Sequence, residues 1–190
     1  MGFNARTDAS TIVSTGVSVS TNITATEDFT INGVTIGPNA TDTPSASALA
    51  THLNTYSAST NVTASAKSQV TLQMLTATAA GATTITAGNS TMIINGTAVT
   101  LTQTNTVTQV ITAINTALSG VGVNVVATQG DGASDIVLTS SSGETIEVTD
   151  VGTHVSQATN IDGAVTATVA LANIKVEFGG QLTLTNTSGG

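Results

Sequence analysis

The 190-residue sequence contains no cysteine and no tryptophan, and only 2% of its residues are aromatic and 7% charged. Without cysteine there is no disulfide framework, no thiolate nucleophile and no cysteine-ligated metal site. Three basic residues stand against eleven acidic ones, which gives a net charge of -8. Such a chain offers no basic surface to the phosphates of nucleic acids or to anionic lipids. No nucleic acid and no membrane is therefore expected as a partner.

Long hydrophobic runs are also missing. No run of about 18 apolar residues, the length needed to span a bilayer, occurs anywhere in the sequence. The first residues, Met1 to Arg6, lack the apolar stretch of a signal peptide. The sequence alone leaves open a cytosolic protein, a protein exported without a cleaved signal, or a piece of a longer chain.

Threonine is the commonest residue, and the 39% hydrophobic share consists mainly of Ala, Val, Ile and Leu. β-Branched side chains suit pleated strands and lose rotamer freedom in helices. The mean hydropathy of +0.29 and the many alternating apolar positions argue against disorder, which combines low hydrophobicity with high charge. We therefore expect extensive strand pairing in place of aromatic anchors, with at least about a third of the residues in strands, above the ordinary share of roughly 20–25%.

The sequence repeats itself. Residues 29–36 and 92–99 both carry an Asn-Gly pair flanked by alternating apolar and polar residues. Asn-Gly supplies the two positive φ values of a type I′ turn, so each copy is predicted to open with a β-hairpin. The only site residues that we select have a structural role in these two turns: Asn32, Gly33, Asn95 and Gly96.

A helical period follows each hairpin. Residues 45–54 align with residues 106–115, and in the second copy apolar residues recur every three or four positions as far as Leu118. Thr106 suits an N-cap and Gly120 a helix stop. After each helix the alternation returns, which predicts short strands separated by turns. These strands cover residues 61–64, 70–72, 84–86, 124–127, 136–138 and 146–148.

Two repeated units of hairpin, helix and antiparallel strands predict a β-rich α+β fold in which each helix covers one face of its sheet. Outside the units, Ile12, Val17, Val19 and Ile23 could form edge strands. Apolar and polar residues alternate again over 164–170 and 174–178. A turn at Gly179-Gly180 is predicted to join this segment to 181–185 in a hairpin. The two ends of the chain are expected to meet in one sheet. The predicted organisation is 1–27 (N-terminal strands), 28–88 (first unit), 89–150 (second unit) and 151–190 (C-terminal strands).

These motifs resemble the IN motif in the outer domains of bacterial flagellins and hook-associated proteins, named for its Ile-Asn pair. The pair stands here at Ile31-Asn32 and Ile94-Asn95, before helices of similar pattern. Further similar segments are 61–65, 70–72, 111–115 and 135–143, and 179–189 is similar to the segment that returns to the flagellin core. Neither end resembles the long core helices, so the chain resembles the variable outer domain alone.

The resemblance implies a structural component of the flagellar filament that is exported without a cleaved signal peptide and lies outside the cell. Its partners would be neighbouring flagellin subunits, and exposed Ser and Thr could carry O-linked glycans. A hook-associated protein fits less well. From another class, an adhesin or a phage tail or decoration domain also uses Thr-rich β structure as a binding module.

Catalytic residues are not indicated. His52 and His154 are the only histidines, and neither a nucleophile elbow nor an HExxH motif is present. We therefore predict no enzyme, no cofactor and no metal. The segment 130–135 lacks the spacing and the bidentate glutamate of an EF-hand. We expect a solvated turn there and outward carboxylates on the following strand. The acidic residues concerned are Asp131, Asp135, Glu144, Glu147 and Asp150.

Overall fold

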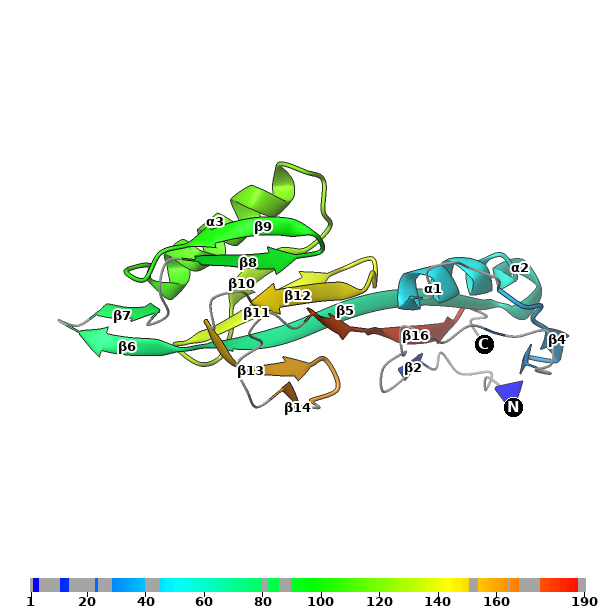
Figure 1. Cartoon of the computed structure of the whole chain (residues 1–190). Helices are drawn as coiled ribbons and strands as arrows, with labels where there is room; N and C mark the ends of the chain where they lie inside the picture. The colour runs from blue at the N-terminus through cyan, green and yellow to red at the C-terminus, as the bar shows by residue number, and fades with distance from the viewer. Residues whose placement is uncertain are drawn as a thin grey trace. The chain divides into compact units, whose positions relative to one another are not determined.

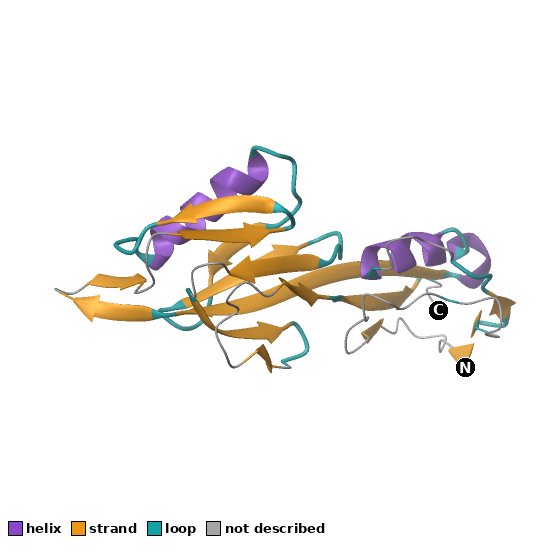
Figure 2. Ribbon diagram, viewed as in Figure 1, coloured by secondary structure: helices purple, strands orange, loops and turns teal. Residues whose placement is uncertain are grey.

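The structure is a computed structural model that describes residues 2–3, 11–13, 23, 29–39, 45–79, 82–85, 90–150, 154–163, 165–167 and 175–187. Strands account for 48% of the residues (Figure 2). The expected β-rich α+β fold is confirmed, and the strand content exceeds the third that we expected. Two compact units divide the chain, one of residues 1–67, 142–144 and 179–190 and one of residues 68–141 and 145–178.

The first unit combines short strands with two helices. Its elements are β1 (Gly2–Phe3), β2 (Thr11–Val13), β3 (Thr30–Ile31), β4 (Val34–Thr35), α1 (Ala46–Asn54), α2 (Ser57–Thr60), the start of β5 (Val62–Met74) and β16 (Gly180–Asn186). The β3–β4 hairpin pairs with β1, which runs parallel to β3. Strand β16 pairs with both β5 and β2. Leu184 lies opposite Ile12, so segments from both ends of the chain share one sheet.

Helix α1 forms where the period predicts it. Ser45 is the N-cap, and its Oγ accepts a hydrogen bond from the Ala48 N–H at 3.1 Å. Its apolar face is buried with residues from the hairpin, β5 and β16 in the core of this unit. That core consists of Ile23, Ile31, Ile36, Ala46, Leu49, Ala50, Leu53, Val62, Ala64, Leu182 and Leu184. Of the expected edge-strand residues, Val17 and Val19 lie outside the described residues.

The second unit holds two larger sheets. One has the order β10 (Val126–Gln129), β11 (Asp135–Ser140), β5, β13 (Val155–Asn160), β14 (Val165–Ala167). The other has the order β15 (Lys175–Phe178), β12 (Ile146–Asp150), β8 (Ser90–Ile94), β9 (Thr97–Leu101). Strand β6 (Thr76–Ala79) pairs with β7 (Ala82–Ile85). All these pairings between described strands are antiparallel.

Helix α3 (Val107–Ser119) contacts β9 and β10 within the second unit (Figure 1). Thr106 is its N-cap and forms a capping box with Gln109, and the helix ends at Gly120, as predicted. The buried stripe consists of Val107, Val110, Ile114 and Leu118. These residues join an otherwise mostly aliphatic core in which Phe178 is the one aromatic side chain among the described residues. Aliphatic side chains, most of them Val and Ile, therefore fill this core.

The prediction of two separate strands at 61–64 and 70–72 is wrong, because β5 is one strand of 13 residues. The intervening residues, Ser65 to Gln69, contain neither glycine nor proline, so nothing forces a turn. Buried and more exposed positions continue to alternate along most of the strand.

The prediction of a hairpin between 174–178 and 181–185 is also wrong. Strand β15 pairs with β12, with Phe178 opposite Ile146, whereas β16 pairs with β2 and β5. Only Gly179 separates the two strands, and one residue is too short for the two-residue turns that hairpins favour. Burial of Phe178 in the second unit's core decides the pairing of β15. From the stretch 164–170, β14 covers residues 165–167, and the rest lies outside the described residues.

Candidate functional site

The two Asn-Gly pairs lie at the tips of the β3–β4 and β8–β9 hairpins. The φ angles are 50° and 78° at Asn32 and Gly33, and 45° and 77° at Asn95 and Gly96. Positive φ at both central residues is the geometry of a type I′ turn. The four selected residues thus occupy turn positions.

Both turn asparagines also bind backbone beyond their hairpins. Asn32 Nδ2 donates to the Thr60 carbonyl at 2.7 Å, within the first unit. Asn95 Nδ2 donates to the Thr145 carbonyl at 3.1 Å, and Asn95 Oδ1 accepts from the Glu147 N–H at 2.6 Å, within the second unit. Each turn therefore fastens its hairpin to a neighbouring segment of the same unit.

A second pair of asparagines, which our sequence reasoning missed, makes the same contacts in both repeats. Asn54 in α1 donates to the Ala64 carbonyl at 2.8 Å and accepts from the Ala64 N–H at 2.7 Å. Asn115 in α3 donates to the Ala127 carbonyl at 2.9 Å and accepts from the Ala127 N–H at 2.8 Å. Each amide thus makes with its alanine the two hydrogen bonds, one donated and one accepted, that a neighbouring strand makes in a sheet. The alignment of Asn54 with Asn115 in the repeat was a signal that could have found them.

Replacing Asn115 with alanine should lower the free energy of unfolding by about 2 kcal/mol, because the N–H and C=O of the buried Ala127 both lose their partner. Urea unfolding followed by circular dichroism measures the loss. Asn124→Ala is the matched control, since Asn124 is exposed, and it should change stability by less than about 0.5 kcal/mol. Equal effects of the two substitutions would contradict the proposed contact.

The acidic residues of the second repeat do not behave alike. Asp131 and Glu144 are exposed, as expected, and Asp135 Oδ2 accepts from the Gly132 N–H at 3.1 Å and so closes its own turn. Asp150 instead is completely buried, so the expectation of an outward carboxylate is wrong at this position. Within the described part of the chain, no group of three or more His, Cys, Asp or Glu residues is arranged to hold a metal ion.

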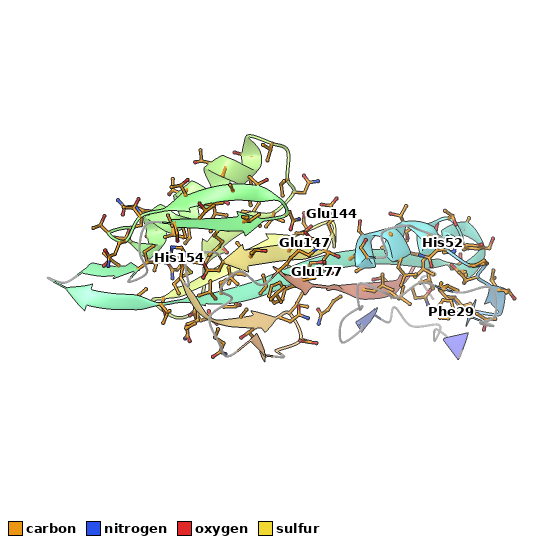
Figure 3. The ribbon with its side chains drawn as sticks, in the orientation of Figure 1. Phe29, His52, Glu144, Glu147, His154 and Glu177 are labelled. Atoms are coloured by element: carbon orange, nitrogen blue, oxygen red, sulfur yellow. The ribbon has the colours of Figure 1, made fainter. Side chains whose placement is uncertain are left out.

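Glu147 on β12 lies directly opposite Glu177 on β15, an unfavourable pairing of like charges. Lys175 relieves it, because its Nζ lies 2.6 Å from Glu177 Oε1 and 3.2 Å from Glu147 Oε1. Figure 3 shows the two glutamates near each other. Hydrogen bonds to Glu177 and then to Glu147 raise the pKa of Lys175 above its ordinary value of 10.5.

Replacing Lys175 with methionine should destabilise the protein more at low salt than at high salt, because exposed charges are screened by salt. The raised pKa means that the charged lysine stabilises the fold fully below its ordinary value, and that this contribution is lost as the pH rises through the raised pKa. Urea unfolding at two salt concentrations measures the effect. Lys175→Met with Glu177→Gln should recover most of the loss, and a loss that is independent of salt would contradict the explanation.

In the second unit, Ser90 meets two polar side chains that lie far from it in the sequence, Asp150 and His154. His154 Nδ1 lies 2.6 Å from Asp150 Oδ1, and His154 Nε2 lies 3.2 Å from Ser90 Oγ. Asp150 Oδ2 accepts from the Val155 N–H at 2.8 Å. His154 and Asp150 are completely buried, and Ser90 is half-buried. Sequence reasoning missed this cluster because 64 residues separate Ser90 from His154 and no local motif links them.

The other histidine has a simpler environment. His52 on α1 is half-buried, and its Nε2 lies 2.8 Å from the Gly37 carbonyl oxygen. Its ring packs edge-on against the Tyr56 ring, with 5.5 Å between the ring centroids. These contacts fix α1 against the segment after the first hairpin. No carboxylate is among these contacts of the ring.

An open recess of about 520 Å³ lies beside α3. Thr112, Thr116 and Ser119 line it with hydroxyl groups, and Val123 and Val126 line it with methyl groups. Val126 is 56% exposed. The recess therefore presents a mixed, uncharged surface without an aromatic platform among these residues.

No helix in the described part of the chain has both the length and the apolar character needed to cross a membrane. No protein-family model matches the chain, and a search of curated proteins finds no matching sequence.

Proposed function

We propose that the chain is the outer, solvent-facing domain of a flagellin and acts as a structural component of the bacterial flagellar filament. One observation carries the proposal: the two copies of the IN-like motif share a turn, a helix and the same contact from that helix to the following strand. Each copy has a type I′ Asn-Gly turn, a following helix, and a helical asparagine that binds the backbone of the next strand. A repeated unit that is stabilised by hydrogen bonds to its own backbone suits a structural domain.

The charge balance and the sheet topology suit this structural role. A net charge of -8 with few basic groups favours solubility and repulsion between exposed surfaces. Pairing of β16 with β2 brings both ends of the chain into one sheet, which suits a domain inserted between two segments of a longer protein. Its partners are then neighbouring flagellin subunits outside the cell, with O-linked glycans as an optional addition to exposed Ser and Thr.

Immunogold labelling of the source cells with antibodies against this chain tests the proposal. We expect gold along the whole length of the flagellar filaments, and loss of that labelling in a strain that lacks the gene. Antibodies against an unrelated surface protein of the same cells are the control. Labelling of the cell envelope, of pili or of phage particles, with bare filaments, would overturn the proposal.

The recess beside α3 is the observation that favours the second candidate, an adhesin or phage binding module. A binding module should retain a defined glycan or protein ligand on an array, and Thr116→Trp should block retention by filling the recess. Ser59→Trp, at an exposed position in the first unit, is the control. Specific, Thr116-dependent retention would favour the binding module over the filament domain.

A further inference from the structure

The cluster of Ser90, His154 and Asp150 has the connectivity that activates a serine hydroxyl. We propose that Ser90 is an activated nucleophile that accepts an acyl group from small esters. The inference goes beyond the filament role and does not depend on it. It concerns one acyl transfer to the protein and requires no turnover.

Asp150 fixes the position of the proton on the His154 imidazole. A carboxylate accepts hydrogen bonds, so Asp150 Oδ1 at 2.6 Å places the proton of a neutral ring on His154 Nδ1. Nε2 then carries a lone pair, and Ser90 Oγ lies 3.2 Å from it. This is the geometry of a general base beside a hydroxyl nucleophile.

The backbone orients the Asp150 carboxylate. Asp150 Oδ2 accepts from the Val155 N–H at 2.8 Å, so the backbone at the start of β13 holds the carboxylate in place. Asp150 is thus a positioning residue that acts through His154. Both side chains are completely buried, and a water-excluded environment strengthens their mutual interaction.

The three side chains of the cluster differ in their exposure to solvent. Ser90 is half-buried, whereas His154 and Asp150 are fully buried. Ser90 is therefore the one member of the cluster with partial solvent exposure. Ser90 also begins β8 and lies opposite the buried Leu101. Partial exposure at a strand end favours a small acyl group such as acetyl.

The reaction balances without a cofactor. Ser90 Oγ attacks the ester carbonyl, and its proton passes to His154 Nε2. The bond from the carbonyl carbon to the leaving oxygen breaks, and His154 returns the proton to the leaving alcohol or phenol. The products are an ester of Ser90 and a free alcohol or phenol.

Incubation of the folded chain with p-nitrophenyl acetate tests the proposal, with peptide-level mass spectrometry to locate the acetyl group. General-base assistance contributes about 10²–10⁴-fold, so acetylation of Ser90 should be at least about 100-fold faster than that of Ser156 in the same sample. Ser156 is a suitable reference because it is also half-buried and its Oγ donates to the Gln73 carbonyl at 3.0 Å, with no histidine among its hydrogen-bond partners.

Ser90→Ala should abolish the fast release of one equivalent of p-nitrophenolate, and Ser156→Ala should leave it unchanged. Asp150→Asn should slow acetylation of Ser90 in protein whose circular dichroism is native. The substitution changes the tautomer of His154 and leaves the Ser90 nucleophile in place. Should that variant unfold, the two serine variants decide the question alone. Equal acetylation of Ser90 and Ser156, or fast release that persists in Ser90→Ala, would overturn the proposal and leave the filament role unaffected.

Discussion

Replacing His154 with alanine should lower the free energy of unfolding by about 3–5 kcal/mol, because it removes a hydrogen bond to a buried carboxylate and opens a cavity. The carboxylate is Asp150, which is completely buried and lies 2.6 Å from the ring. The imidazole also contacts Ser90 across the start of β8. Its loss should therefore loosen the contacts between β8, β12 and β13. Urea unfolding at neutral pH, followed by circular dichroism, measures the effect.

His52→Ala is the matched control, since that half-buried ring makes one hydrogen bond to a backbone carbonyl. This substitution should lower the free energy of unfolding by about 1 kcal/mol. The double variant His154→Ala with Asp150→Ala should be more stable than the sum of the single losses predicts, because the hydrogen bond between the two side chains is lost in both single variants and is counted twice in their sum. A loss below about 1 kcal/mol for His154→Ala would show that the cluster is not important for stability.

Replacing Phe178 with alanine should lower the free energy of unfolding by about 3–5 kcal/mol, the usual loss for a buried phenylalanine. Phe178 is 1% exposed and is the aromatic member of the second unit's core. The residues around it are aliphatic and lie mostly in paired strands, which cannot collapse far into the cavity. Thermal or urea unfolding of the variant measures the loss.

Val176→Ala on the same strand is the control, because Val176 is only half-buried against that core. Removal of two partly buried methyl groups should cost about 1 kcal/mol. An equal effect at both positions would mean that β15 is fixed by its strand pairing with β12 and not by the aromatic anchor.

Local features were predictable from local chemistry. Asn-Gly selects a type I′ turn wherever the flanking residues alternate, so both hairpins were found at their observed positions. The spacing of Val107, Val110, Ile114 and Leu118 defines one face of α3, and Thr106 and Gly120 are good cap residues. The abundance of threonine and valine predicted the strand content. Each of these properties depends on a few neighbouring residues.

Pairing between distant segments was not predictable in the same way. Nothing in residues 174–185 distinguishes a hairpin from two strands in separate units, and burial of Phe178 decides between them. The alternating pattern over 61–72 is compatible with two strands or one, and the single strand β5 results from its partners β11, β13 and β16.

The sequence by itself determined the elements of this protein: its β-rich composition, its two Asn-Gly turns and its capped helices, each of which follows from backbone preferences within a few residues. Only the tertiary structure decided which strands pair and that Asn54 and Asn115 bind the backbone of the following strands. It also decided that Ser90, Asp150 and His154 meet. The physical reason is that a long-range contact is selected by the burial and hydrogen bonding of both partners together, which neither segment contains alone.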